Sequence, residues 1–294
     1  MTISLIIPTL NGAKDLPALM TRLKNQTVPP DEIIVVDSES ADGTAQLAKD
    51  LGAKVIEIER KDFDHGGTRD MALRHSRGDV VLFMTQDALP ADEHYIERLL
   101  APFDDPRVAA VGGRQAPKKD ARPFERLVRE HNYPTHTRVW DASAIGEMGV
   151  RAFLISDVCS AYRRSAYLNA GGFDHPIMTN EDMLMAQRLL EEGHLLCYCG
   201  AAAVLHSHNM TLKQQFARNY IVGRTMKRYE ARFSHVSEMG EGTKLAKSVL
   251  LALLKEGRPF EMLCFCMDCA ARLLGNRLGR MQESRMEKKT ETKA

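Results

Sequence analysis

The apolar run Val81–Met84 constrains the fold of this chain more than any other feature, because the polar triplet Thr-Gln-Asp at 85–87 ends it abruptly. A continuous apolar run of this length is typical of a strand buried on both faces of a parallel sheet. Open α/β sheets bind ligands at the carboxyl ends of their strands. We therefore expect Asp87 at the mouth of a sheet, where a divalent cation and a diphosphate can meet.

The first 115 residues alternate short β-branched runs with helical patterns. This alternation predicts an α/β domain with a mostly parallel sheet that helices cover on both faces. The expected strands are Ile3–Ile7, Glu32–Val36, Lys54–Ile58, Val80–Met84 and Val108–Gly112. The expected helices are Lys14–Asn25, Thr44–Asp50, Thr68–His75 and Glu93–Leu100.

Residues 116–150 differ in composition, with prolines, charges and the single tryptophan. They predict an irregular or partly helical segment, which either lines a substrate cleft or is a solvated connector. Regular structure is expected again at Ile155–Ser160 and in a helix from Asp182 to Glu192. Thr211 and Gln214 fit a capping box that opens a further helix.

The segment from Lys244 to Arg280 is amphipathic and basic. Its apolar residues Leu245, Val249 and Leu253 recur at helical spacing. Such a segment can lie in a membrane interface beside anionic lipids, or it can form a helical pair packed on the main domain or on a second subunit. Residues 283–294 are strongly charged and predict a disordered tail.

The net charge of +1 on 294 residues argues against a nucleic-acid-binding protein, which usually carries a strong basic excess. The first residues predict a strand and not a signal peptide, and the six cysteines lack the spacing of a disulfide framework. We therefore expect a cytoplasmic protein with reduced thiols. Cys264, Cys266 and Cys269 lie at spacings that do not converge on one helix, which favours buried apolar cysteines over a zinc site.

Two later motifs add chemistry to the sheet edge. Glu181 and Asp182 open a predicted helix, where one carboxylate can remove a proton from a substrate hydroxyl. His206 and His208 are two residues apart, so on a strand both would point to one face. One of them is a candidate cation ligand, and a buried histidine with a structural role is the alternative for either.

Two loops near the amino terminus can hold a nucleotide. Asp37 and Ser38 end the second predicted strand, where a carboxylate can accept from a base or a ribose, although a turn residue is the commoner role there. The loop 64–69, Asp-His-Gly-Gly-Thr-Arg, is rich in donors and permits close backbone approach. Thr68 can cap a helix or bind a phosphate, and Arg69 suits a diphosphate or a carboxylate such as Asp87.

These motifs together resemble the inverting glycosyltransferases of family 2, which have the GT-A fold. The resemblance covers about residues 2–230. It rests on motifs at 6–12 (Ile-Ile-Pro-Thr-Leu-Asn-Gly), 34–44, 77–87, 171–174 and 181–188. The motifs at 63–69 and 85–88 are similar to the rhamnosyltransferase branch. The resemblance thus implies dTDP-L-rhamnose as donor, a saccharide or lipid-linked acceptor, and a role in surface polysaccharide synthesis.

The resemblance also implies roles for individual residues. Asp182 would be the catalytic base, Glu181 would orient the acceptor, and Asp87 with His206 or His208 would hold Mg²⁺ or Mn²⁺. The family's metal motif is Asp-x-Asp, and here Thr85 replaces its first acid, so the protein supplies fewer charges to the cation. The donor would contact Pro8, Thr9, Asn11, Asp37, Ser38, His65, Gly67, Thr68, Arg69, Gln86 and Asp87.

The predicted organisation is a transferase domain at 1–230, amphipathic basic helices at 231–282 and the tail at 283–294. Peripheral contact with the inner face of the plasma membrane and a homo-oligomer both stay open. Two alternative functions also remain: a family 2 transferase with another donor such as a UDP-hexose, and a sugar-nucleotide-binding partner without turnover in a membrane polysaccharide assembly complex.

Overall fold

The computed structural model describes residues 1–234 and 241–291. Within them one sheet has nine strands in the order β3-β2-β1-β4-β8-β6-β9-β5, and β7 pairs with β9. The strands are β1 Ile3–Thr9, β2 Glu32–Asp37, β3 Lys54–Glu57, β4 Val80–Met84, β5 Leu89–Pro90, β6 Val108–Ala116, β7 Arg138–Trp140, β8 Cys159–Arg163 and β9 Leu195–Leu205.

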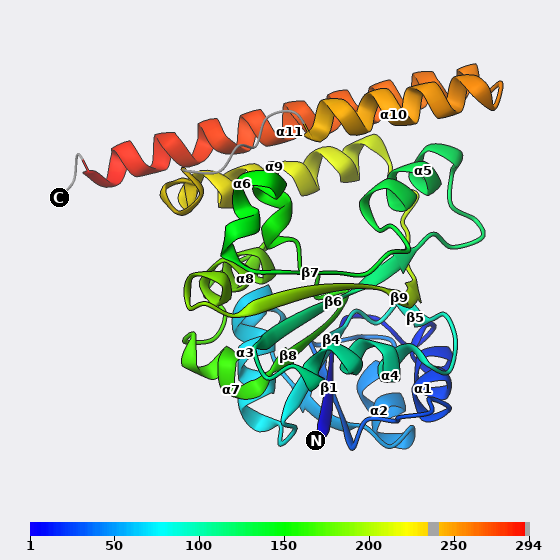
Figure 1. The fold of residues 1–294 in the computed structure, drawn as a ribbon, viewed down its shortest axis with the longest axis vertical. Helices are drawn as coiled ribbons and strands as arrows, with labels where there is room; N and C mark the ends of the chain where they lie inside the picture. The colour runs from blue at the N-terminus through cyan, green and yellow to red at the C-terminus, as the bar shows by residue number, and fades with distance from the viewer. Residues whose placement is uncertain (235–240, 292–294) are drawn as a thin grey trace. The chain divides into compact units, whose positions relative to one another are not determined.

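Helices flank both sides of this sheet (Figure 1). The α-helices are α1 Leu16–Lys24, α2 Thr44–Asp50, α3 His65–His75, α4 Tyr95–Leu100, α5 Pro123–Asn132, α6 Ile145–Met148, α7 Arg164–Asn169, α8 Glu181–Glu191, α9 Leu212–Arg228, α10 Glu241–Lys255 and α11 Pro259–Glu291. The expected α/β architecture is confirmed, and β1, β4 and their neighbours form a core of fully buried side chains.

Strand direction determines which residues share an edge. β1, β2, β3 and β4 are parallel, β8 runs antiparallel between β4 and β6, and β6 is parallel to β9. The carboxyl ends of β1, β2, β4, β6 and β9 therefore lie at one edge of the sheet, together with the amino end of β8. We call this the carboxyl edge.

Three local predictions were wrong. The helix expected from Thr68 begins at His65, because the Asp64 side chain caps it by accepting from the Gly67 N–H at 2.8 Å. The regular structure expected at Ile155–Ser160 is β8, which begins only at Cys159 after a turn. His206 and His208 follow β9 in a loop and are not part of a strand.

The described chain divides into two compact units. Unit 1 comprises Met1–Ala116, Tyr133–Ile177 and Glu181–His206, and unit 2 comprises Pro117–Asn132, Met178–Asn180 and Ser207–Ala294. In this division α9 lies with the C-terminal helices in unit 2, and the expected boundary at residue 230 stays a prediction. The segment 116–150 holds α5, β7, α6 and 3₁₀ turns.

Within unit 2, α9 and α11 pack closely along a seam of glycines. A Cβ atom at Gly279 would lie 2.1 Å from the Tyr220 carbonyl oxygen, so only glycine permits this approach. The tail expected to be disordered is helical as far as Glu291, and residues 292–294 lie outside the described residues. The helix continues into this segment because the buried Glu283 of α11 pairs with Arg224 at 2.8 Å and with Arg228 at 2.6 Å, both in α9.

The capping box is confirmed at Thr211 and Gln214. Val249 and Leu253, from the predicted amphipathic stripe, are buried in a cluster with Phe124, Phe265 and other residues of unit 2. This stripe therefore holds unit 2 together. No helix in the described ranges combines the length and the apolar character that crossing a bilayer requires.

Candidate active site

The loops after β1 and β2 are joined by hydrogen bonds at the carboxyl edge. The buried Asp37 carboxylate accepts from the Thr9 hydroxyl at 3.1 Å and from the Ser40 hydroxyl at 2.6 Å and backbone N–H at 2.9 Å. Asn11 adopts a left-handed conformation (φ 49°), and its side-chain oxygen accepts from the Ala41 N–H at 3.0 Å. The two loops therefore form one preorganised wall.

Two of the predicted donor-binding residues carry buried hydroxyl groups without partners. Among the described residues, Ser38 Oγ and Thr68 Oγ1 are buried and have no hydrogen-bond partner. Both side chains are 3% exposed. A buried polar group without a partner carries an energetic cost, which a ligand that supplies the missing hydrogen bond can remove. Pro8, in contrast, lies within β1 opposite Val36 and offers only its ring and its carbonyl oxygen.

Gln86 ties the end of β4 to the end of β1. Its Oε1 accepts from the Leu10 N–H at 2.9 Å, and its Nε2 donates to the Leu10 carbonyl at 3.1 Å. A Cβ atom at Gly12 would lie 2.7 Å from Gln86 Oε1, so the glycine leaves room for the two hydrogen bonds between Gln86 and Leu10. The amide of Gln86 is thus engaged with the backbone, beside the neighbouring Asp87.

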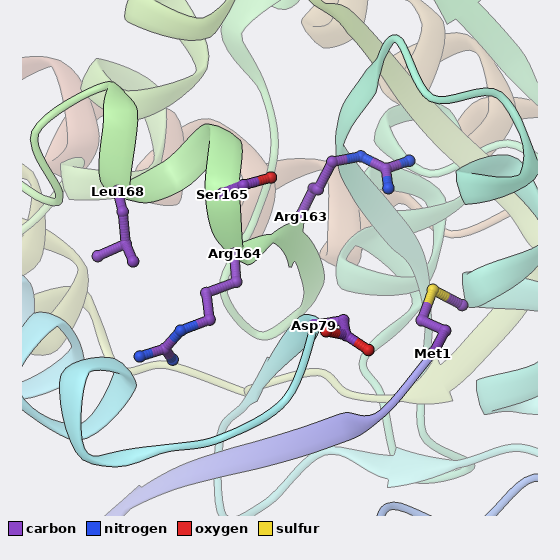
Figure 2. Close-up of a pocket in the computed structure, with 6 residues that line it drawn as sticks. All are labelled: Met1, Asp79, Arg163, Arg164, Ser165 and Leu168. Atoms are coloured by element: carbon purple, nitrogen blue, oxygen red, sulfur yellow. The ribbon is translucent and has the colours of Figure 1, made fainter.

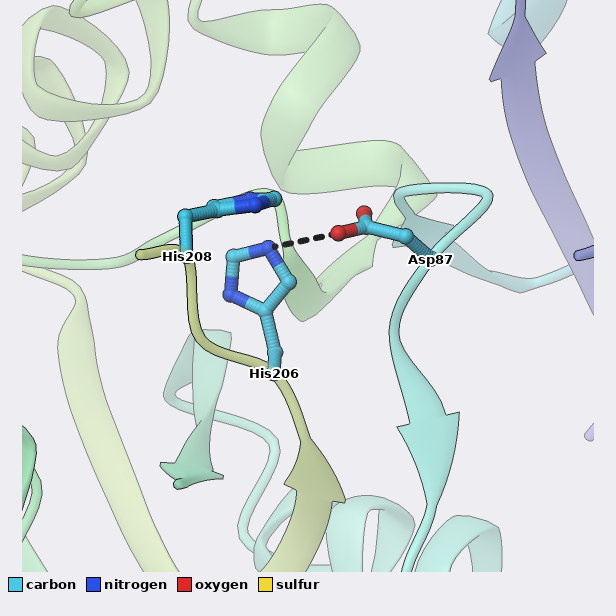
Figure 3. Close-up of side chains that lie close together, drawn as sticks. All are labelled: Asp87, His206 and His208. Carbon is cyan, nitrogen blue, oxygen red and sulfur yellow. Dashed lines mark ion pairs between the residues drawn. The ribbon is translucent and has the colours of Figure 1, made fainter. Parts of the chain in front are cut away.

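Asp87, His206 and His208 come together just beyond the ends of β4 and β9 (Figure 3). One potential ligand atom from each side chain lies within 4.8 Å of the others. His206 is buried, and its Nε2 is 3.4 Å from Asp87 Oδ2, whereas His208 is exposed. A carboxylate and two imidazoles form a donor set that suits a divalent metal ion.

Gln115, near the end of β6, orients the His206 ring. Its Oε1 lies 3.0 Å from His206 Nδ1, and its Nε2 donates to the Tyr133 and Ser156 hydroxyls, both at 2.9 Å. An amide oxygen can only accept, so this arrangement places the proton on Nδ1. With the proton on Nδ1, Nε2 is the ring nitrogen on the side of Asp87, and in neutral His206 it is the atom that can bind a metal.

The amino end of α3 is held rigidly. Asp64 accepts from the N–H groups of Gly67 and Ile177, and the His65 N–H donates to the Ile177 carbonyl at 2.9 Å. A Cβ at Gly67 would lie 2.5 Å from Asp64 Oδ2, so glycine is required for this cap. His65 Nδ1 lies 3.1 Å from Arg69, one turn later in the helix.

Arg69 is buried and binds carboxylates inside unit 1. Its Nη1 is 3.1 Å from Glu181 Oε1, and its Nε is 3.6 Å from Asp157 Oδ2. The sequence suggested a diphosphate or Asp87 as its partner, and the structure pairs it with these two acids instead. A guanidinium with two buried carboxylates forms a network that is costly to disrupt.

Asp182 belongs to the same acid cluster. The Asp157 N–H donates to Asp182 Oδ2 at 3.3 Å, and the Met183 N–H donates to Asp182 Oδ1 at 2.7 Å. Burial raises the pKa of Asp182 well above its usual range, and the negative charges of Glu181 and Asp157 add to this rise. Since β8 pairs Cys159 with Met84 at the end of β4, the cluster lies at the carboxyl edge.

Sequence reasoning missed Gln115 and Asp157. Each is a polar residue in or beside a largely buried strand, and both are 2% exposed. A buried amide or carboxylate in such a run usually has a specific partner, which was the available signal. The partners themselves are distant in the chain and could not be named.

A separate pocket of about 560 Å³ lies at the opposite edge of the sheet (Figure 2). It is lined by Met1, Asp79, Arg163, Arg164, Ser165 and Leu168. Its two arginines donate to backbone carbonyls, Arg163 to Val108 and Phe103 and Arg164 to Leu73. Their guanidinium groups therefore stabilise the fold, and the pocket lacks the grouped acids and histidines of the carboxyl edge.

Comparison with known proteins agrees with this geometry. The model of the family described as glycosyl transferase family 2 matches residues 4–169, more than half of the chain. The chain belongs to this family. The family 2 glycosyltransferase is 38% identical over 289 residues to the O-antigen chain rhamnosyltransferase RfbN of Salmonella typhimurium, covering 97% of this chain and 91% of the relative.

A second relative is the O-antigen chain rhamnosyltransferase WbaN of Salmonella anatum, 35% identical over 96% of this chain and 90% of the relative. Among solved structures, the transferase is similar to the mannosyltransferase PcManGT of Pyrobaculum calidifontis, in complex with GDP-Man and Mn²⁺. The TM-score is 0.60 at 17% identity, with 99% of this chain and 79% of the other covered. This likeness shows the shared fold, which is GT-A.

Proposed function

We propose that this glycosyltransferase moves L-rhamnose from dTDP-L-rhamnose to a saccharide or lipid-linked acceptor in O-antigen-type surface polysaccharide synthesis. The proposal is supported by the names of RfbN and WbaN, which align with nearly the whole chain. A UDP-hexose donor is the alternative within the same chemistry. A sugar-nucleotide-binding partner without turnover is the alternative outside it.

The observation that carries the catalytic proposal is a carboxylate of high proton affinity, Asp182, at the same edge of the sheet as Asp87 and His206. Direct displacement at the anomeric carbon needs a base opposite the leaving diphosphate, and Asp182 takes the proton of the acceptor hydroxyl. Because this base is on the acceptor side, transfer in one step inverts the anomeric configuration.

The donor lies along the wall made by the loops after β1 and β2. Pro8, Thr9, Asn11, Asp37 and Ser38 hold the nucleoside, and the unpartnered Ser38 hydroxyl gains a hydrogen bond there. At the amino end of α3, the chain directs His65, Gly67 and Thr68 toward the diphosphate, since a helix amino terminus favours anions. Gln86 keeps this wall closed, Arg69 holds Glu181, and Glu181 orients the acceptor.

Asp87, His206 and His208 would hold the divalent cation. Mg²⁺ prefers oxygen ligands, whereas the two imidazoles here also suit Mn²⁺, the ion present with PcManGT. When bound, the cation neutralises charge on the departing nucleoside diphosphate. Gln115 fixes the His206 tautomer, and Asp87 adds the one carboxylate.

The Asp182→Asn variant tests the base. The amide keeps the shape of the side chain but cannot accept a proton, so transfer should fall by about 10²–10⁴-fold. The measurement is dTDP release from dTDP-L-rhamnose in the presence of acceptor. Donor binding, followed by thermal shift, should stay near the wild-type value. Turnover at the wild-type rate would refute the assignment of the base.

A thermal-shift screen tests the donor. A ligand that binds only the folded state raises the melting temperature. At a concentration of a hundred times its Kd, it adds about 2.7 kcal/mol to the free energy of unfolding. We expect dTDP-L-rhamnose with Mn²⁺ to give a larger shift than UDP- or GDP-sugars. A larger shift with a UDP-hexose would replace the proposed donor, and dTDP-L-rhamnose binding without transfer to any acceptor would support the partner role.

We propose further that α11 contacts an anionic membrane surface, at the inner face of the plasma membrane. Its outer face exposes Phe260 (69%), Leu263 (57%) and Leu274 (54%). Exposed basic residues, Arg258 and Arg277 among them, flank these apolar side chains. A second copy of this face would bring like charges together, whereas anionic lipids complement both the charge and the apolar stripe.

A further inference from the structure

Asp157 is a buried carboxylate that the transfer mechanism above does not use. It lies in the turn before β8 and is 2% exposed. Its Oδ1 accepts from the Ser160 hydroxyl at 2.7 Å and from the Tyr162 hydroxyl at 3.0 Å. Its backbone N–H donates to Asp182 Oδ2 at 3.3 Å. One residue thus fixes its own side chain and holds the proposed base.

One guanidinium, two carboxylates and two phenols face Asp157. From α3 comes Arg69, which also contacts the His65 carbonyl oxygen, and from α8 come Glu181 and Asp182. Tyr162 of β8 donates to it directly. Tyr167 of α7, which donates to Asp70, is near enough for the charge of Asp157 to raise the pKa of its phenol.

Three carboxylates therefore lie together, and the Arg69 guanidinium pairs with two of them, Asp157 and Glu181. Burial raises the pKa of Asp182, and the negative charges of Glu181 and Asp157 add to this rise. Burial also raises the pKa of Asp157 to about 7, while Arg69 lowers it and Glu181 raises it.

We infer that Asp157 is a positioning residue for Asp182. Its N–H orients the Asp182 carboxylate, and its negative charge increases the affinity of Asp182 for the proton of the acceptor hydroxyl. The inference rests on the proposed role of Asp182 as base. It adds a residue that touches neither donor nor acceptor and acts through the base alone.

The test is the titration of Asp182 in the full-length Asp157→Asn protein. Asparagine can still accept from Ser160 and Tyr162 and keeps the backbone N–H, but it carries no charge. We expect the titration midpoint of Asp182 to fall by about one pH unit. The readout is the carboxyl ¹³C resonance in ¹³C-aspartate-labelled protein, assigned with Asp182→Asn.

Tyr162→Phe provides a second variant, should Asp157→Asn fail to fold. Removing the phenol donor lets Asp157 keep its proton to higher pH, so the midpoint of Asp182 should move in the same direction by a smaller amount. Asp268→Asn is the matched control, because it neutralises another buried carboxylate that is paired with an arginine, in unit 2. We expect no change in the midpoint there.

An unchanged or higher midpoint in a folded Asp157→Asn protein would overturn the inference, as would an equal shift in Asp268→Asn. Neither result bears on the proposed function, which Asp182→Asn tests by activity. Loss of transfer in Asp182→Asn with no midpoint shift in Asp157→Asn would leave the base in place and remove the role of Asp157.

Discussion

Gln86 shapes the carboxyl edge of the sheet without occupying the proposed metal site. Both ends of its amide bind the backbone of Leu10, so it joins β4 to β1 where the donor wall begins. An aspartate there could not donate to the Leu10 carbonyl. Because Thr85 replaces the first acid of the family's metal motif, the proposed cation site has one carboxylate and two imidazoles, and residues that orient these imidazoles gain importance.

Gln115→Leu tests this dependence at the scale of one residue. Without the amide oxygen, the His206 tautomer is no longer fixed, and the affinity for Mn²⁺ should fall by about 10–100-fold. The measurement is the electron paramagnetic resonance signal of free Mn²⁺ during titration of the protein. Gln26→Leu, which removes another buried amide in unit 1, should leave this affinity unchanged. Equal affinity in Gln115→Leu and the wild type would contradict the orienting role.

At the scale of elements, α10 and α11 use two different apolar faces. Val249 and Leu253 of α10 pack inside unit 2 with Phe124 and Phe265. The outer face of α11 is exposed, and its apolar residues recur at about seven-residue intervals from Phe260 to Met281. An exposed apolar stripe of this length is uncommon on a protein that meets only water, which is why we assign it to a lipid surface.

The double substitution Phe260→Ser and Leu263→Ser tests this assignment. Removing two large apolar side chains from the contact should lower the partition coefficient onto anionic vesicles by about 100-fold. Sedimentation with phosphatidylglycerol vesicles measures it, and zwitterionic vesicles should bind the wild type weakly. Val139→Thr, at an exposed apolar residue of β7, is the control. Unchanged sedimentation would exclude the lipid contact, and a fall in molecular mass in solution would indicate a second copy instead.

At the scale of the whole molecule, buried acids link stability to pH. In the folded chain the pKa of Asp157 is about 7, against 3.8 ordinarily, so the folded state binds more protons between these values. The unfolding free energy then decreases as the pH rises through this range. The contribution of Asp157 to the free energy of unfolding is fully present below pH 3.8 and is lost by about pH 7.

In the Asp157→Asn protein there is no carboxyl group at position 157 to titrate. The melting temperature of the wild type, minus that of the variant, should therefore decrease between about pH 4.5 and about pH 7.5. Differential scanning calorimetry at matched ionic strength measures the difference. A constant difference, or one that grows with pH, would show that Asp157 does not hold its proton more tightly in the folded state.

The local sequence determined most of the secondary structure and the fold class. Buried strands such as β1 and β4 are continuous apolar runs, and α2 has the bounds that its pattern predicts, because hydrophobic periodicity acts within one element. The same logic identified Asp87, Asp182 and the two histidines as chemically notable. The roles proposed for them come from the resemblance to family 2 glycosyltransferases.

Only the tertiary structure decided which groups meet. Arg69 is more than eighty residues from Asp157 and over a hundred from Glu181, and Gln115 is about ninety from His206. Side chains so distant in sequence are brought together by strand order and by the reversed direction of β8, which no local pattern encodes. The proton affinity of Asp182 depends on those neighbours and on burial, so it is a property of the folded chain.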